Sequence, residues 1–261
     1  MSDIADPSRH LVLTVDVERY SGRDNVLQWR VQQSLPRIMQ QAREELGLRP
    51  DGWLVQPSGD GQLAILPQGT SERTVVTRLA PTIDRLLREH NHGLAPKARI
   101  RLRIGVHEGL VHLDGENGFP GEAVVTVCRL VDSPQLKAAL RRFPDAQAAL
   151  IVSDRLYQDV VRHYGDLRPE HFLRVTANLP EKSFDAVAWI HVPGENVAAA
   201  TAGQPSPAAT PDQTAPATAP DQSAAGGQTF QHITAHGPAA FGNGNVVTTY
   251  GSADGATPHR P

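Results

Sequence analysis

The chain is poor in residues on which several classes of protein depend. Its 261 residues include one cysteine, Cys128, which excludes an intramolecular disulfide and a zinc site made of cysteines. No apolar run approaches the ~20 residues that a transmembrane helix needs, and the acidic N-terminus lacks the apolar stretch of a signal peptide. We therefore expect a cytoplasmic protein that has no membrane partner.

An excess of positive charge is also missing. Of the 25 basic and 28 acidic residues, one arginine and four acids follow residue 192, so 24 of each kind precede it. This balance argues against a nucleic-acid partner that is held by bulk charge. The strand patterns also lack the surface aromatic residues on which an RNA-binding sheet stacks bases.

Hydrophobic periodicity predicts strands and helices in mixed order before residue 193. Strands are expected at 10–16, 52–57, 61–66, 99–106, 110–113, 149–152, 174–175 and 184–192. Helices are expected near 27–46, 71–89, 121–131 and 135–142. Pro36 predicts a kink or two abutting helices in the first of these, and Gly47 predicts its end. We expect 110–113 to pair back onto 99–106 in a mixed sheet layered by helices.

Two aspartates stand at the ends of strongly apolar strand patterns. Asp16 ends the first strand, and Asp60 lies in a Ser-Gly-Asp-Gly turn between the strands of an expected tight hairpin. Two carboxylates ~4 Å apart repel by roughly 4 kcal/mol at an effective dielectric constant of 20, unless a cation or a proton intervenes. Such a pair is suited to hold Mg²⁺ together with the phosphates of a substrate.

Four segments occur in the order of four motifs of one enzyme family: 16–21, 58–61, 103–109 and 121–130. They resemble the first and second metal motifs, the Arg-Ile-Gly-Ile-His-x-Gly strand and the arginine-bearing helix of the class III adenylate/guanylate cyclase catalytic domain. The resemblance covers about residues 10–192. It implies an α+β fold, a ferredoxin-like (βαββαβ-type) mixed sheet with helices packed on it, followed by a disordered tail.

The resemblance also implies a site shared between two copies of the chain. Asp16 and Asp60 would bind two Mg²⁺ or Mn²⁺ ions, and Arg129 would act as the catalytic arginine that stabilises charge on the phosphate. A nucleoside triphosphate would be the substrate, and a head-to-tail homodimer would be required. The implied substrate-binding residues are Val17, Gly59, Gln56 and Lys182.

Three positions depart from the family pattern. Arg19 replaces the glycine after the first aspartate, and Val125 replaces an asparagine that orients the ribose. Gln56 stands where the family has a base-selecting lysine or glutamate, and the partner of that residue falls around Gly118. Two functions therefore stay open. One is a cyclase that makes a 3′,5′-cyclic nucleotide and pyrophosphate, and the other is a catalytically inactive sensor or scaffold.

The C-terminal third has a different character. Residues 193–227 are rich in Ala, Thr, Pro and Gln and predict a disordered linker. Residues 228–250 are uncharged and β-prone, and they resemble RHIM-like bacterial amyloid-signalling motifs that self-assemble. Plain disorder is the alternative for this stretch, and disorder is expected for 251–261. The resemblance implies an effector protein with the same motif as a partner.

Overall fold

The computed structural model describes residues 5–48 and 52–202. The expected self-assembling motif at 228–250 and the segment 251–261 lie outside these residues, as does most of the expected linker. The described part of that linker contains the helix α7 (Val197–Ala202), and Val197 is buried in a hydrophobic cluster with Ile190 and Val192. Buried apolar contacts therefore continue past residue 193, where the boundary of the domain was expected.

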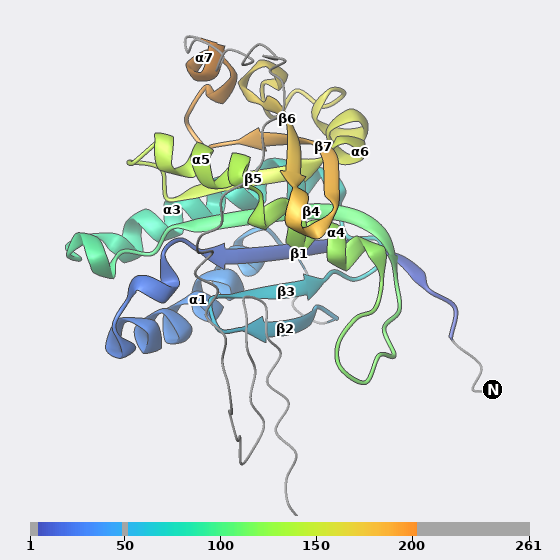
Figure 1. Ribbon diagram of the computed structural model, residues 1–261, viewed down its shortest axis with the longest axis horizontal. Coiled ribbons are helices and arrows are strands. Elements are labelled where there is room, and N and C mark those ends of the chain that lie inside the picture. The colour runs from blue at the N-terminus through green and yellow to red at the C-terminus, as the bar shows by residue number, and fades with distance from the viewer. Residues whose placement is uncertain (1–4, 49–51, 203–261) are drawn as a thin grey trace, which may run out of the picture. The chain divides into compact units, whose positions relative to one another are not determined.

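A seven-stranded mixed sheet is the centre of the fold. Its strands are β1 (Ser8–Val17), β2 (Leu54–Ser58), β3 (Gly61–Ile65), β4 (Leu102–Val111), β5 (Ala148–Ser153), β6 (Leu173–Leu179) and β7 (Phe184–His191). They lie in the order β2-β3-β1-β4-β5-β7-β6 (Figure 1). Neighbours are antiparallel except for the parallel pair β4 and β5. The sheet confirms the predicted α+β class.

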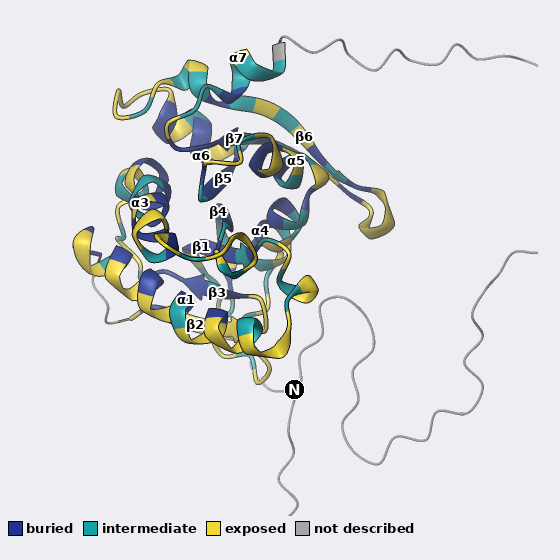
Figure 2. Cartoon of the chain, turned by 90° about the vertical axis from the view of Figure 1, so that its left-hand side faces the viewer, coloured by how far each residue is buried: buried dark blue, intermediate teal, exposed yellow. Residues whose placement is uncertain are grey.

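Helices cover both faces of the sheet. They are α1 (Asn25–Glu45), α2 (Glu72–Thr74), α3 (Ala80–Asn91), α4 (Glu122–Asp132), α5 (Pro134–Arg142) and α6 (Asp154–Leu156), besides α7. Viewed from the side, α3 lies on one face of the sheet and α4 and α5 lie on the other (Figure 2). Within residues 5–48 and 52–202, no helix combines the length and the apolar character that crossing a bilayer requires.

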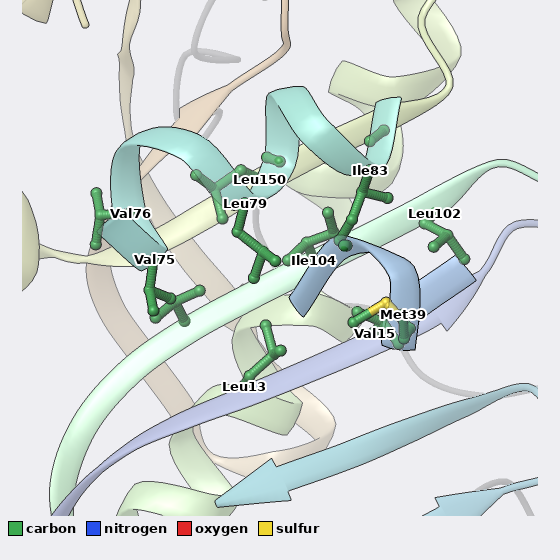
Figure 3. Close-up of a cluster of buried hydrophobic side chains, with 14 of the residues drawn as sticks. Leu13, Val15, Met39, Val75, Val76, Leu79, Ile83, Leu102, Ile104 and Leu150 are labelled. Atoms are coloured by element: carbon green, nitrogen blue, oxygen red, sulfur yellow. The ribbon is translucent and has the colours of Figure 1, made fainter. Parts of the chain in front are cut away.

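The alternation of side chains along β1 decides which face carries Asp16. Leu13 and Val15 pack with Met39 of α1 and Ile83 of α3 in the main core (Figure 3). The residues that alternate with them along β1 point to the opposite face, where Val12 packs with Ala123 and Val127 of α4. Asp16 therefore lies on the α4 face, at the end of β1.

The prediction that residues 110–113 form a separate returning strand was wrong. Strand β4 continues to Val111 and pairs with β1 along its whole length. The glycines of β4 serve close packing against α4. A Cβ added to Gly105 would lie 2.5 Å from Val131, and one added to Gly109 would lie 2.7 Å from Ala123. The absence of side chains lets the helix approach the strand.

Helix α1 is one continuous helix that includes Pro36, so two abutting helices were the wrong alternative. Its end is the one that Gly47 predicted. Gly47 has φ +62°, its N–H donates to Glu44, and the N–H of Leu48 donates to Arg43 at 3.0 Å. These two bonds form a Schellman motif, which satisfies carbonyl groups of the last turn.

A buried histidine predicts how stability depends on pH. His191 is 4% exposed and stacks on Phe172 at 4.8 Å. Burial, and then the charge of His171, lower the pKa of His191 to about 4. Between pH 6.5, the usual pKa of an unfolded histidine, and about pH 4, the unfolded chain binds a proton that the folded chain does not bind. We therefore expect the free energy of unfolding to fall by about 2 kcal/mol between pH 7 and pH 5 through this group alone.

Urea unfolding at both pH values measures this effect. In His191→Leu the loss between the two pH values should shrink by about 2 kcal/mol. His163 is exposed, so His163→Leu offers a matched control for the replacement of a histidine by leucine. An equal pH dependence in His191→Leu and in the native chain would contradict the prediction.

Candidate functional site

The fold brings Asp16 and Asp60 together. Asp16 is paired in register with Gly61, the residue after Asp60. The N–H of Val17 donates to the carbonyl oxygen of Asp60 at 2.8 Å, which fixes the hairpin turn against the end of β1. Burial raises the pKa of Asp16 to about 6, with Arg103 opposing the rise and the neighbouring carboxylate of Asp60 adding to it. Two acidic groups thus share one small region.

Arg103 is the cation that the chain itself supplies to this pair. It lies opposite Asp16 on β4 and forms an ion pair with it, and its side chain is 13% exposed. Its Nε atom is buried and has no hydrogen-bond partner within the described part of the chain. One guanidinium beside two carboxylates leaves a net negative charge, so the site still favours a further cation.

The donor set of the pair fits a hard divalent cation. Carboxylate oxygens are the ligands that Mg²⁺ and Mn²⁺ prefer. Within residues 5–48 and 52–202, no group of three or more His, Cys, Asp or Glu side chains gathers to hold a metal. Two carboxylates are therefore the ligands that this region could offer to a metal ion. Mg²⁺ commonly takes one or two carboxylates and fills its other positions with water and substrate phosphates.

A close backbone approach explains the glycine after Asp60. A Cβ added to Gly61 would overlap the carbonyl oxygen of Val15, whereas one added to Gly59 would meet nothing within 4 Å. We expect Gly61→Ala to lower the free energy of unfolding by about 3 kcal/mol, because backbone must move. Gly59→Ala, the matched control, should change it by less than about 1 kcal/mol. Chemical denaturation of both variants measures the difference, and equal losses would contradict it.

The amide expected to bind phosphate directly after Asp16 is used by the fold. Val17 donates to Asp60, as noted above, and the N–H of Glu18 donates to Arg101 at 2.9 Å. The N–H of Val17 thus already has a partner within the chain, and a role for Val17 in substrate binding stays a prediction. The tight turn that begins at Arg19 is the next part of the chain that can present amide groups.

Helix α1 holds this turn and the Asp60 hairpin together, a connection that sequence reasoning missed. The side-chain amide of Gln32 donates to the hydroxyl of Tyr20 at 2.8 Å and to the carbonyl oxygen of Gly59 at 3.2 Å. Gln32 is an exposed polar residue in a helical pattern. Nothing in the sequence distinguishes it from other glutamines of α1, so only the fold could identify it.

Gln56 lies next to Gly118, the position predicted for its partner. The side-chain amide of Gln56 is next to Gly118, since a Cβ added there would come within 2.7 Å of Oε1 of Gln56. The two positions are far apart in sequence, one on β2 and the other in the loop after β4. The fold therefore brings this candidate base-recognition pair together within one chain.

Arg129 and Lys182 lie elsewhere in the described chain. The guanidinium of Arg129 is 5.5 Å from the ring centre of Phe184, and Nζ of Lys182 is 2.6 Å from Asp132. Both contacts are near the β6–β7 hairpin, at the opposite edge of the sheet from the β2–β3 hairpin that carries Asp60 (Figure 1). Within the described residues, neither cation forms an ion pair or a hydrogen bond with Asp16 or Asp60.

Lys182 already has an acidic partner. Burial raises the pKa of Asp132, but the ammonium groups of Lys137 and Lys182 outweigh it, so that the pKa lies below its usual value. Asp132 is thus an ionised partner of Lys182. A phosphate bound by Lys182 would have to compete with this ion pair.

Comparisons with known proteins identify the fold. No family model matches the sequence, and no curated protein matches it. The chain is similar to the solved structure of an adenylate/guanylate cyclase/hydrolase from Silicibacter pomeroyi, with 21% identity, a TM-score of 0.53, and coverage of 73% of this chain and 99% of that one. It is also similar to the guanylyl cyclase Cya2, with 17% identity, a TM-score of 0.51, and coverage of 73% and 94%. The described domain therefore has a cyclase-like fold.

Proposed function

We propose that this chain is a class III nucleotide cyclase, which converts a nucleoside triphosphate to a 3′,5′-cyclic nucleotide and pyrophosphate as a homodimer. The observation that carries the proposal is the meeting of Asp16 and Asp60 at the end of β1, within a fold shared with cyclase domains. A merely structural turn would gain nothing from two repelling carboxylates.

Two groups of residues would contribute to the reaction: the two aspartates of one copy and Arg129 of the other. Asp16 and Asp60 would hold two Mg²⁺ or Mn²⁺ ions, which when bound polarise the triphosphate and make the ribose 3′-hydroxyl more acidic. The 3′-hydroxyl oxygen attacks the α-phosphorus and its proton passes to water, while the bond from that phosphorus to the bridging oxygen breaks and pyrophosphate leaves. Arg129, supplied by the second copy, would stabilise the charge that develops on the phosphate oxygens.

Recognition of the base is assigned to Gln56. Its amide carries both a donor and an acceptor, so it can pair with the edge of a purine in more than one way. Gly118 beside it has no side chain that could add a second hydrogen bond. This pair therefore favours weaker discrimination between bases than a charged residue would give.

Product formation tests the proposal directly. The purified full-length chain is incubated with each of the four nucleoside triphosphates and Mn²⁺, and the products are separated and identified by mass spectrometry. A cyclic nucleotide and an equal amount of pyrophosphate from at least one substrate are expected. No cyclic product from any of the four, at high protein concentration, would refute the proposal.

Substitution of Arg19 should lower the affinity for the triphosphate without lowering the free energy of unfolding. The backbone of Arg19 has φ +57°, a conformation that favours glycine, and its side chain is exposed and follows the end of β1. We propose that its guanidinium binds the triphosphate. In Arg19→Gly the affinity for a non-cyclisable triphosphate analogue should fall about tenfold, while the free energy of unfolding stays equal or rises by up to about 1 kcal/mol.

Calorimetric titration and chemical denaturation of the same preparations measure both quantities. Arg19→Lys is the matched variant that keeps the charge, and it should keep most of the affinity. If Arg19→Gly binds the analogue as tightly as the native chain does, Arg19 has no part in phosphate binding.

A second candidate function is a cyclase-like sensor or scaffold without turnover. Val125, on α4, is 37% exposed and has no polar group with which to orient a ribose. In this alternative, nucleotide binding without a product passes a signal to an effector protein through residues 228–250. Binding of a triphosphate analogue without turnover would favour it, and a peptide of these residues that stays soluble and forms no fibres would contradict the assembly step.

A further inference from the structure

A groove of about 320 Å³ lies along α1. Gln32, the residue of α1 that contacts the Asp60 hairpin, does not line it. One wall is α1, and the other is the end of α3 with the segment that leads into β4. Its floor is apolar, since Val31 and Ile100 are almost fully buried there and Leu94 lines it. Trp29 stands at its rim with 62% of its surface exposed. A volume of this size suits a small organic molecule.

The charged groups that line the groove are cationic. Arg30 and Arg37 both line it, two turns apart on the same side of α1. Within the described residues neither guanidinium has an ion pair or a hydrogen bond, and no acidic residue lines the groove. His90 also lines it, and burial lowers the pKa of His90, so its ring is neutral near pH 7. An apolar floor under two unpaired cations matches a molecule with an apolar body and an anionic group.

Both walls of the groove are hydrogen-bonded to the loops of the candidate site. From α1, Gln32 reaches Tyr20 and Gly59, as described above. From the other wall, the carbonyl oxygens of Lys97 and Arg99 accept bonds from Arg23 at 3.0 and 2.7 Å. Arg23 and Tyr20 belong to the turn after Asp16, and Gly59 precedes Asp60. A change in the distance between the two walls would therefore move the loops that carry Asp16 and Asp60.

We infer that this groove binds a small amphipathic anion, with an apolar or aromatic body and one carboxylate or phosphate, and that its occupancy alters the loops that carry Asp16 and Asp60. The binding step is independent of the proposed cyclase activity. The effect on the loops deepens that proposal, because it assigns the groove to regulation of the same site.

Titration calorimetry of the full chain with three matched probes tests the binding. 1-Naphthoate has the body and the charge, 1-naphthalenemethanol has the body alone, and inorganic phosphate has the charge alone. We expect 1-naphthoate to bind at least about tenfold more tightly than either of the others. No binding of 1-naphthoate at millimolar concentration, or equal binding of the acid and the alcohol, would overturn the inference.

Variants locate the bound probe. Arg30→Gln with Arg37→Gln should weaken 1-naphthoate at least about tenfold and leave 1-naphthalenemethanol unchanged. Arg141 is another exposed arginine, on α5 and outside the groove, so Arg141→Gln is the matched control and should bind as the native chain does. Ser34→Phe, which fills the groove, should weaken both naphthalene probes. An unchanged affinity in the double variant, with its fold intact, would overturn the site.

Backbone amide NMR shifts test the effect on the loops. In the native chain, saturation with 1-naphthoate should shift the resonances of Tyr20 and Gly59. In Gln32→Ala the Gly59 shift should be lost while the affinity stays within about twofold. Shifts confined to the groove would overturn the coupling. Neither measurement uses turnover, so the failure of this inference and that of the proposed cyclase activity are detected separately.

Discussion

In Asp60→Asn we expect cyclic nucleotide formation to fall at least about a thousandfold, while the fold stays intact. The substitution removes one of the two carboxylates that would hold the divalent ions, and several kcal/mol of charge stabilisation in the transition state go with it. Asp60 is exposed in a two-residue turn, and the hairpin bond to Val17 comes from its backbone carbonyl oxygen. The free energy of unfolding should therefore change by less than about 0.5 kcal/mol.

Initial rates with Mn²⁺ and the preferred triphosphate measure the loss, and chemical denaturation measures the stability. Asp145 is an exposed aspartate away from the site, so Asp145→Asn controls for the loss of one surface charge and should be fully active. A variant at position 60 that keeps more than about a tenth of the native rate would remove Asp60 from the catalytic machinery.

Local patterns sufficed to predict the elements that carry the aspartates. The alternation of Leu13 and Val15 fixed the strand, and the Ser-Gly-Asp-Gly turn fixed the hairpin, because both are properties of a few neighbouring residues. The meeting of Asp16 with Asp60 then followed from the pairing of β1 with β3. The placement of Gln56 near Gly118 came from the family resemblance, and the fold agrees with it.

Other contacts between distant segments, which no local pattern or family motif marks, could not be predicted. The role of Gly105 and Gly109 in the packing of α4 is one example, since it is invisible without the helix in place. The bond from the N–H of Val17 to the carbonyl oxygen of Asp60 joins β1 to a turn more than forty residues later in the chain, so the sequence did not reveal it. The ion pair of Lys182 with Asp132 depends likewise on how the β6–β7 hairpin lies against α4. In each case the tertiary contact decides the role of the residue.

The second large effect is recovery of activity when two inactive variants are combined. The guanidinium of Arg129 lies over Phe184 of β7, and within the described residues it forms no ion pair or hydrogen bond with Asp16 or Asp60, so we propose that a second copy supplies it. In a head-to-tail homodimer, each site would take its aspartates from one copy and Arg129 from the other. Asp60→Asn and Arg129→Ala should each be inactive alone.

Mixed at equal amounts and allowed to exchange, these variants should recover about one quarter of the native activity. Half of the dimers are then mixed by chance, and each mixed dimer has one intact site and one that carries both substitutions. Asp16→Asn mixed with Asp60→Asn is the matched control and should recover nothing, because both aspartates of a site come from the same copy. Differently tagged chains, purified through both tags, isolate the mixed dimer for the assay. If mixed dimers of Asp60→Asn and Arg129→Ala form and stay inactive, Arg129 does not act across the interface, and the shared-site geometry is wrong.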